Sequence, residues 1–288
     1  MSNTITLAKS YVSNLDKVYQ KEAVTSVLNS DKGLAREGAK AGEIVIPKID
    51  MDGLGDYDRN SGYTTGSANL DWETVAFNYD RGRIFQVDVM DDEETINLAF
   101  GQLGAEFMRT KVAPEGDAFT FATLAGLDSI GSATGSYSDG DAVLEAIIEA
   151  QNAMDEEEVD DGRYLFINPS LMRAIEALET YKSQQVIAEF AKVIKVPAKR
   201  FYTAITLLSG SDDESAGHYT ASGNAINFMI VDPGAVLKFD KHVASNIITP
   251  EANQSADAYM LKYRKYGLVT AYENKRAGIY VNSVAATA

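Results

Sequence analysis

The chain has 288 residues, 45% of them hydrophobic, and a net charge of −16 because 42 acidic residues outnumber 26 basic ones. A chain of this size can bury a substantial core, and the absence of cysteine excludes disulfides, thiolate metal sites and cysteine nucleophiles. The negative charge repels phosphate backbones, which argues against a conventional nucleic-acid-binding protein.

Residues 1–42 are expected to form an N-terminal arm, with helical segments over AKSYVSNLDKVYQKEAVTSVLN that end at the small-residue stretch Gly33–Gly42. The first residues lack the basic and apolar regions of a signal peptide, and no run of about eighteen apolar residues follows. We therefore expect a protein that is made in the cytoplasm and does not enter a membrane.

A long β-hairpin is predicted next. Glu43–Ile49 has the composition of a strand, and its Pro47 suits a sheet edge. Trp72–Tyr79 returns as a second strand with alternating apolar side chains. Between them, Asp50–Asp71 is rich in Gly, Asp, Asn and Ser and almost without aliphatic residues. A polar loop of this length is uncommon inside a compact domain, and it usually serves a partner or is disordered.

A strand then leads into a long helix. Phe85, Val87 and Val89 alternate with polar residues, which predicts a strand with one apolar face. Four carboxylates follow, where they would complement the positive end of a helix dipole. They are Asp91, Asp92, Glu93 and Glu94.

The predicted helix carries an apolar stripe at helical spacing, formed by Ile96, Phe100, Leu103 and Phe107. Pro114 should kink or break it, and Glu115 and Asp117 directly behind the proline can restart it. If the helix continues to about Ala125, it is a rod of roughly 45–50 Å. We expect a helix of this length to extend beyond a compact core and to lie across another part of the structure.

The middle of the chain is predicted to be a separate α/β unit. A helix with apolar residues from Leu144 to Ile148 precedes the buried strand Tyr164–Ile167. Two further helices follow, one from Pro169 and one over Ser183–Val196, before the apolar strand Ile226–Val231. This alternation predicts a small sheet with helices packed on it.

The C-terminal region returns to strands. Tyr259, Leu261 and Tyr263 alternate with polar residues, and Leu268–Tyr272 and Gly278–Val281 supply two more strands.

Several segments in this order carry a resemblance to a known family. They are the extended hairpin, DRGR-x-F-x-V-D-x-M-D-x-E-E-T, a long helix with V-A-P-E-x-D, and the late block Y-R-K-Y…Y-E-N-K…G-I-Y-V. Together they resemble the major capsid proteins of tailed bacteriophages, which have the Hong Kong 97-type fold. The resemblance covers nearly the whole chain and lies in the order of the segments, since no short motif is diagnostic alone.

The resemblance implies an α+β Hong Kong 97-type capsid fold with an N-terminal arm, an extended β-hairpin loop, a peripheral domain and an axial α/β domain. The arm would be residues 1–42, and the hairpin loop that reaches over a neighbouring subunit would be residues 43–82. Residues 83–130 and 242–288 would form the peripheral domain, with a long spine helix and a β-sheet. Residues 131–241 would form the axial domain around the five- and six-fold axes.

The implied function is that of a non-enzymatic coat protein. Copies would assemble as hexamers and pentamers into the icosahedral shell of a virion, made in the host bacterial cytoplasm. The partners would be other copies of the chain, a portal, and packaged double-stranded DNA bound without sequence specificity. A separate scaffolding protein is also implied, because only about forty residues precede the hairpin, whereas the family's founding member carries a long scaffolding segment there.

Nine residues are candidates for contacts between subunits: Arg59, Tyr63, Trp72, Arg81, Arg83, Asp91, Asp92, Glu93 and Glu94. Arg81 and Arg83 at the hairpin base are candidates for pairing with a neighbour's acidic helix start. The alternative is an ordinary solvated surface pair worth under about 1 kcal/mol, and the sequence does not decide between them.

The founding member also links a lysine of its extended loop covalently to an asparagine of a neighbour. Here no lysine occurs between Met51 and Arg81. We therefore expect noncovalent locking, and not a bond from Lys48 at the hairpin base to Asn274 or Asn282.

No catalytic residue, cofactor site or metal site is predicted. The acidic cluster Asp155–Asp161 lacks the spacing of a calcium loop and is typical of a solvated helix end. His218 and His242 lie in different segments and form no H-x-x-x-H or H-x-E pattern, which leaves a metal-dependent hydrolase as the less favoured alternative. The other alternative is an encapsulin-like nanocompartment shell, which shares the fold but encloses enzymes instead of DNA.

Overall fold

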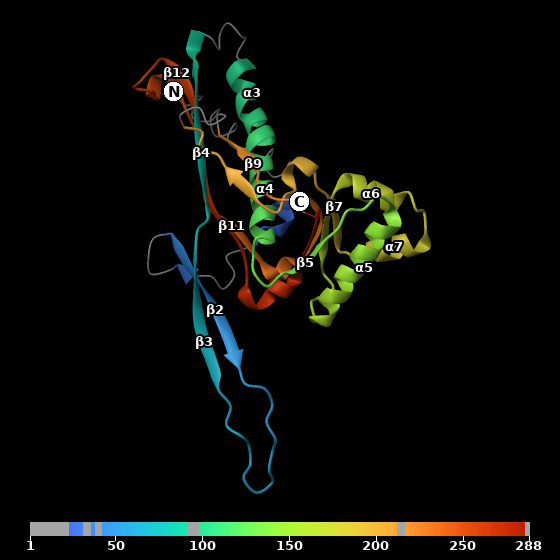
Figure 1. Cartoon of the computed structure of the whole chain (residues 1–288). Coiled ribbons are helices and arrows are strands. Elements are labelled where there is room, and N and C mark those ends of the chain that lie inside the picture. The colour runs from blue at the N-terminus through green and yellow to red at the C-terminus, as the bar shows by residue number, and fades with distance from the viewer. Residues whose placement is uncertain (1–22, 31–35, 38–41, 91–97, 212–216, 286–288) are drawn as a thin grey trace.

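The computed structural model describes residues 23–30, 36–37, 42–90, 98–211 and 217–285. A long hairpin projects from the body of the molecule, and a helix-covered lobe lies to one side of a long central helix (Figure 1). Within the described ranges, no helix is both long enough and apolar enough to cross a membrane.

The α-helices are α3 (Leu98–Phe107), α4 (Ala113–Ala125), α5 (Gly140–Glu156), α6 (Pro169–Glu176) and α7 (Tyr181–Ala188). The short helical turns are η1 (Val24–Leu28), the π-helical η2 (Met108–Val112), η3 (Ala198–Arg200), η4 (Pro233–Ala235), η5 (Pro250–Ala252) and η6 (Glu273–Gly278). The strands are β1 (Arg36–Glu37), β2 (Glu43–Met51), β3 (Ala68–Ala76), β4 (Tyr79–Asp88), β5 (Gly131–Thr134), β6 (Tyr164–Ile167), β7 (Lys192–Lys195), β8 (Ile205–Leu207), β9 (Tyr219–Ala221), β10 (Ile226–Val231), β11 (Val236–Ile248), β12 (Ala258–Ala271) and β13 (Ile279–Ser283).

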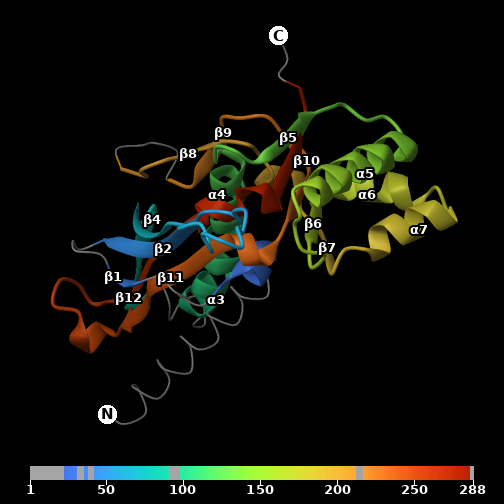
Figure 2. The ribbon, with the colours of Figure 1, turned by 90° about the horizontal axis from the view of Figure 1, so that it is seen from below.

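A five-stranded sheet forms the centre of the lobe, with the strand order β5-β13-β10-β6-β7. Helices α5, α6 and α7 lie together on one side of it (Figure 2), where Leu165, Ile167 and Phe228 join their core. On the other face, Phe166 and Met229 pack in a second core with α4 and η1. Because both faces are covered, every residue of β10 is buried, which explains why five of its six residues are apolar.

The C-terminal strand β13 belongs to this sheet. It runs antiparallel to β10 and parallel to β5, whereas the expected boundaries placed all of residues 242–288 with the other sheet. The side chains of Ile279 and Val281 explain the difference, since they are buried in the same core as Phe121 and Leu124 of α4. The last strand of the chain, β13, therefore belongs to the sheet of the middle α/β unit.

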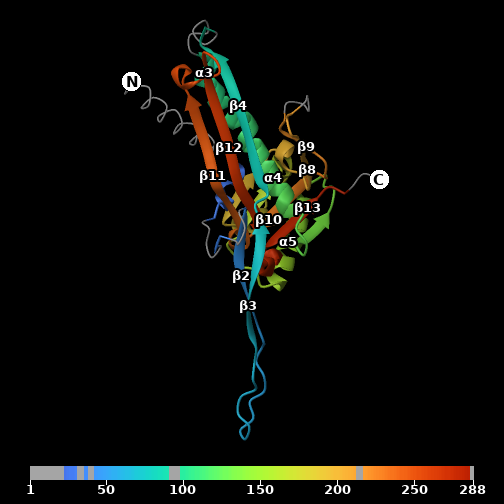
Figure 3. The ribbon, with the colours of Figure 1, turned by 90° about the vertical axis from the view of Figure 1, so that its left-hand side faces the viewer.

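A three-stranded antiparallel sheet, β11-β12-β4, lies along the long helix (Figure 3). Met108 and Val112 of the helix pack on Leu261 and Tyr263 of β12. Phe85 of β4 joins this core, as its alternating pattern predicts, and Ile84 on the opposite face is 52% exposed.

The long helix is continuous from Leu98 to Ala125, so the expected break at Pro114 is not found. Val112 and Ala113 keep helical backbone angles, with φ/ψ of −69°/−48° and −64°/−47°. The π-helical turn η2 lies just before the proline, where the regular ladder would otherwise lose a donor, and local π turns are a known way to absorb such a change. At about 1.5 Å per residue the described helix is roughly 40 Å long.

The second half of this helix is the centre of the molecule and not a rod outside its core. Ala113, Ala118, Phe121 and Leu124 are all 0% exposed. The Phe121 ring contacts the rings of Phe166 and Phe201 at centroid distances of 5.2 and 4.8 Å. A neighbour is therefore not needed to cover α4.

The predicted hairpin is confirmed. β2 and β3 pair antiparallel from Glu43↔Ala76 to Met51↔Ala68. Ile44 and Ile46 anchor its base in a small core on β11 and β12. Lys48 forms an exposed ion pair with Glu273 of its own chain, at 2.8 Å.

Candidate inter-subunit surfaces

The distal half of the hairpin carries an exposed apolar face. The pairs Pro47↔Trp72, Ile49↔Leu70 and Met51↔Ala68 lie on the same side of the hairpin because side chains alternate along each strand. Four of these side chains are 44–68% exposed, namely Ile49, Met51, Leu70 and Trp72. We call these six residues the apolar hairpin face.

This face is on the opposite side of the hairpin from the one that packs on the body. Ile44 and Ile46, at even positions of β2, are buried against the chain's own sheet, whereas Ile49 and Met51, at odd positions, are exposed. The even positions beyond the base are the polar Lys48 and Asp50. A change of one residue in the period moves the apolar set to the other side of a strand. The apolar hairpin face is therefore turned away from its own body.

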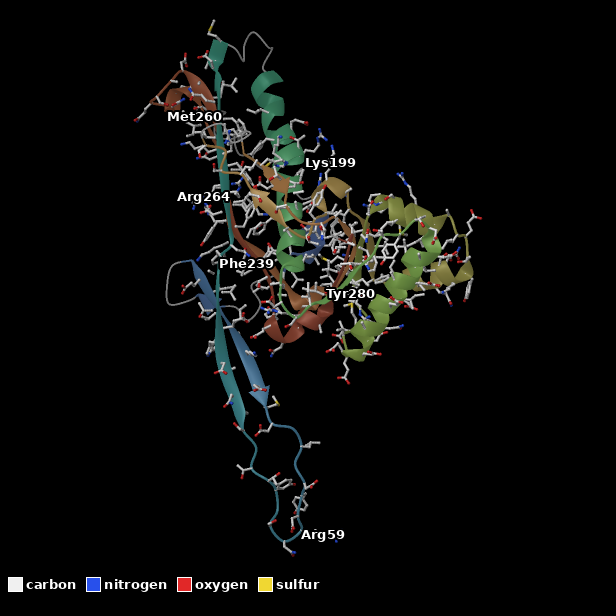
Figure 4. The ribbon with its side chains drawn as sticks, viewed as in Figure 1. Arg59, Lys199, Phe239, Met260, Arg264 and Tyr280 are labelled. Atoms are coloured by element: carbon white, nitrogen blue, oxygen red, sulfur yellow. The ribbon has the colours of Figure 1, made fainter. Side chains whose placement is uncertain are left out.

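The hairpin tip, residues 52–67, ends in a tight turn. Asp58 accepts hydrogen bonds from Asn60 N at 2.5 Å and Ser61 N at 3.2 Å, which hold the pKa of its carboxyl below the usual range. The rings of Tyr57 and Tyr63 meet edge to face at 4.9 Å. Tyr63 is nevertheless 89% exposed, and Arg59 lies at the outer end of the tip (Figure 4).

The structure gives the two hairpin-base arginines partners within their own chain. Arg81 Nε lies 2.7 Å from Glu115 Oε1, in a largely buried ion pair, and Arg81 Nη2 donates to Leu208 O at 2.8 Å. Arg83 Nη1 donates to Gly210 O at 3.1 Å. The acids expected to pair with them lie outside the described residues: Asp91, Asp92, Glu93 and Glu94.

Glu115 is the centre of this junction. Tyr79 Oη donates to it at 3.2 Å, and His218 Nδ1 lies 3.5 Å away. His218 has a positive φ of 78°, a strained conformation for a residue other than glycine. Glu115 thus ties the hairpin base, α4 and the segment between β8 and β9 together, which explains why Arg81 is held inside its own chain.

The variant Glu115→Gln should lose less stability in acid than the wild type. Burial alone would raise the pKa of Glu115, but the nearby His218 and the hydrogen bonds from Arg81 outweigh it and lower the pKa below its ordinary 4.5. Such a carboxylate stabilises the folded chain above its ordinary pKa, and this stabilisation is lost as pH falls through the folded value. Urea unfolding from about pH 7 to about pH 3 measures the slope. The exposed Glu145→Gln should keep the wild-type slope, and an equally steep Glu115→Gln would contradict the assignment.

A pocket of about 260 Å³ opens beside this junction. We call it the base pocket. Its lining residues are Tyr79, Arg81, Gly82, Arg83, Phe85, Phe107, Lys111, Val112, Glu115, Ser209, Gly217, His218 and Tyr263.

A second buried carboxylate, Asp117, fixes the N-terminal turn η1 on α4. Thr25 donates to Asp117 Oδ1 from its N at 3.0 Å and its Oγ1 at 2.7 Å, while Val24 N donates to Oδ2 at 3.1 Å. Arg200 Nη1 lies 2.9 Å from the same Oδ2. Lys238 Nζ completes the network by donating to Thr25 O and Oγ1 at 2.9 and 2.6 Å.

Sequence reasoning missed the roles of Glu115 and Asp117, which it treated as acids that restart a helix. A signal was present: they are the only charged residues between Lys111 and Asp128 in an otherwise apolar and small-residue helix. Charges at such positions are almost never buried unless they are paired. The pattern therefore predicts buried ion pairs, although it does not name the partners.

The two histidines lie apart in the fold. His218 is beside Glu115, whereas His242 lies on β11 and is exposed. Among the residues that the structure describes, no group of three or more His, Cys, Asp or Glu is placed to hold a metal ion. The acidic cluster at the end of α5 contributes Asp155, which pairs with the buried Arg163 at 2.5 Å.

Comparison with known proteins identifies the fold. No protein-family model and no curated protein sequence matches the chain. A solved structure from Gordonia phage Cozz matches 92% of this chain and 87% of its own, with a TM-score of 0.61 and 12% identity. The capsid structure of cyanophage P-SCSP1u matches 88% of this chain and 86% of its own, with a TM-score of 0.56 and 10% identity.

A virus-like particle from Pyrococcus furiosus matches even more of the length, 96% of this chain and 98% of its own, with a TM-score of 0.58 and 10% identity. At such low identity the likeness concerns the fold. This chain, with its several sheets and few helices, has the mixed α+β fold of phage capsid structures.

Proposed function

We propose that this chain is the major coat protein of a tailed phage, whose copies assemble as hexamers and pentamers into an icosahedral shell around double-stranded DNA. The observation that carries the proposal is the apolar hairpin face, because it is exposed and turned away from the body that it projects from. Apolar patches of this kind mark surfaces for a partner. The capsid fold supports another copy of the chain as that partner.

The expected domain roles form part of the proposal. Residues 43–82 would be the extended loop, and residues 83–130 with most of 242–288 the peripheral domain. Residues 131–241 together with β13 would be the axial domain. The role is structural and not enzymatic, and the further partners are a separate scaffolding protein and a portal. A net charge of −16 suits a wall that holds DNA without sequence-specific contacts.

A cargo shell is the second candidate. The match to a particle that is named virus-like, which covers 98% of that chain, supports a shell that is not a virion. The content of purified particles separates the two candidates. Nuclease-protected double-stranded DNA supports the phage coat, whereas a stoichiometric enclosed enzyme without DNA supports the cargo shell.

The variant Leu70→Asp should abolish shell assembly without unfolding the subunit. Leu70 is 55% exposed in the single chain, so an aspartate there costs the fold little. In a shell the same carboxylate would be buried without a partner, at a cost of several kcal/mol in every subunit. Sedimentation velocity and negative-stain microscopy, with a scaffolding protein present, measure the yield of shells.

Asn69→Asp is the matched control, because it adds the same charge on the polar side of the same strand. It should assemble like the wild type. A wild-type yield of shells from Leu70→Asp would overturn the role of the apolar hairpin face, and a wild-type chain that stays monomeric under all conditions would overturn the proposed function.

A further inference from the structure

The base pocket has the size and walls of a receptor for protein side chains. Its volume of about 260 Å³ lies just below the roughly 300–1,000 Å³ that is typical of small-molecule sites. Aromatic rings from three separate elements face it, those of Phe85, Phe107 and Tyr263. Such walls favour an aromatic or aliphatic occupant.

The described residues that line the pocket carry a net positive charge, in contrast to the chain as a whole. Among the described lining residues, Arg81, Arg83 and Lys111 stand against one carboxylate, that of Glu115, although the chain as a whole carries −16. Arg81 is already paired with Glu115. Lys111 is exposed, and it has no hydrogen-bond or ion-pair partner within the described part of the chain. The pocket therefore favours an occupant that is acidic as well as apolar.

The hairpin tip has both properties. It carries Asp52, Asp56 and Asp58 against one arginine, and its Leu54 and Tyr63 are 108% and 89% exposed. The acidic segment at the end of α5, by contrast, has no large exposed apolar side chain. Charge and shape together thus select the tip.

The tip cannot reach the pocket of its own chain. The pocket is lined by β4, which continues directly from the hairpin base, whereas the tip lies at the far end of the hairpin (Figure 4). The nine paired residues of each strand make a ladder of about 30 Å between them. Any occupant of this pocket that comes from a tip belongs to another copy.

We propose that the hairpin tip of one copy seats Tyr63 and its neighbouring aspartates in the base pocket of the next copy, against Arg83 and Lys111. The proposal rests on the proposed shell function and names the receiving surface on the neighbour. A contact between the tip of one copy and the base of the next is heterologous, and when repeated about an axis it closes a ring.

A disulfide test exploits the absence of native cysteine. Thr64 adjoins Tyr63, and Ser209 lies on the rim of the pocket, so Thr64→Cys with Ser209→Cys places two thiols at the proposed contact. After oxidation of assembled shells, non-reducing electrophoresis should show a ladder of linked subunits. Thr64→Cys with Tyr181→Cys is the control, since Tyr181 is 75% exposed on α7 in the lobe, and it should give monomers.

A charge exchange gives an independent readout. Lys111→Glu or Asp56→Lys alone should lower the yield of shells at least about tenfold, since each places like charges together. The double variant should restore most of the yield. If the cysteine variants fail to assemble, the yield of shells from the double charge variant still tests the tip-to-pocket contact.

The tip-to-pocket contact and the shell function are tested by different outcomes. Shells without a ladder, or a double variant no better than its parents, overturn the tip-to-pocket contact and leave the shell function standing. A cysteine-free wild-type chain that forms no shell under any condition overturns the shell function itself.

Discussion

Replacing Asp117 by asparagine is expected to lower the free energy of unfolding by about 3–5 kcal/mol. The carboxylate is 0% exposed and accepts hydrogen bonds from two backbone N–H groups and the Thr25 hydroxyl, besides pairing with Arg200. An asparagine of the same shape keeps one acceptor oxygen but turns an NH₂ group toward donors. Arg200 then loses its ion pair with Asp117 while it stays largely buried, and that accounts for much of the expected loss.

Urea titration at neutral pH measures this loss. Asp161→Asn is the matched control, because Asp161 is exposed and its one contact with described residues is the hydrogen bond that its backbone carbonyl accepts from Arg163 N. The control should change stability by less than about 0.5 kcal/mol. If Asp117→Asn behaved like the control, the network would not hold the N-terminal turn, and η1 would owe its position to Leu28 and the core around it.

Local pattern was sufficient to predict the hairpin, the strand β4 and the long helix. Each depends on a period that can be read within ten to thirty residues: alternation in β2, β3 and β4, and a stripe in the helix. The prediction of a break at Pro114 was wrong, for a reason that the sequence pattern does not contain. Proline removes a donor, but a π-helical turn placed just before it lets the helix continue.

Non-local packing explains what could not be predicted. β13 follows β12 in the chain, but its place in the five-stranded sheet is set by the core that buries Ile279 and Val281. The same holds for Arg81. In the sequence it suits a surface ion pair, but in the fold it pairs with Glu115, 34 residues later. A short-range pattern identifies a charged residue at a hairpin base, but not the buried carboxylate that will face it.

The candidate inter-subunit surfaces also include features that local pattern predicts and features that only the fold reveals. Tyr63, Trp72 and Arg59 were predicted as contact residues, and the structure places all three on the projecting hairpin. Near Pro47 the apolar side chains of β2 change from the side of the hairpin that packs on the body to the opposite side. This change is seen only once the register and burial are known, because Ile46 is buried while Ile49 is exposed. Residues from five separate segments of the chain line the base pocket, so no local sequence pattern predicts it.

The variant Lys238→Met should remove most of a rise in stability with pH that the wild type shows in the alkaline range. Burial lowers the pKa of Lys238 from its ordinary 10.5 to about 7, helped by the charge of Lys265 and opposed by Asp117 and Asp240. Between these two values the unfolded chain binds a proton that the folded chain does not. Stability therefore increases from about pH 7 toward pH 10.5, and below pH 7 the full cost of burying the charge is present.

Since one pKa unit corresponds to about 1.4 kcal/mol, the wild type should gain on the order of 2–3 kcal/mol more than Lys238→Met between about pH 7.5 and about pH 9.5. Urea titrations across this range give the slope, which is the readout because methionine also deletes the two hydrogen bonds to Thr25. Lys262→Met, at an exposed position of β12, should keep the wild-type slope. A Lys238→Met slope equal to that of the wild type would mean that Lys238 stays charged in the folded chain, stabilised by Asp117 and Asp240. Its expected loss would instead identify a neutral amine that uses two N–H groups to hold the N-terminal turn on the central helix.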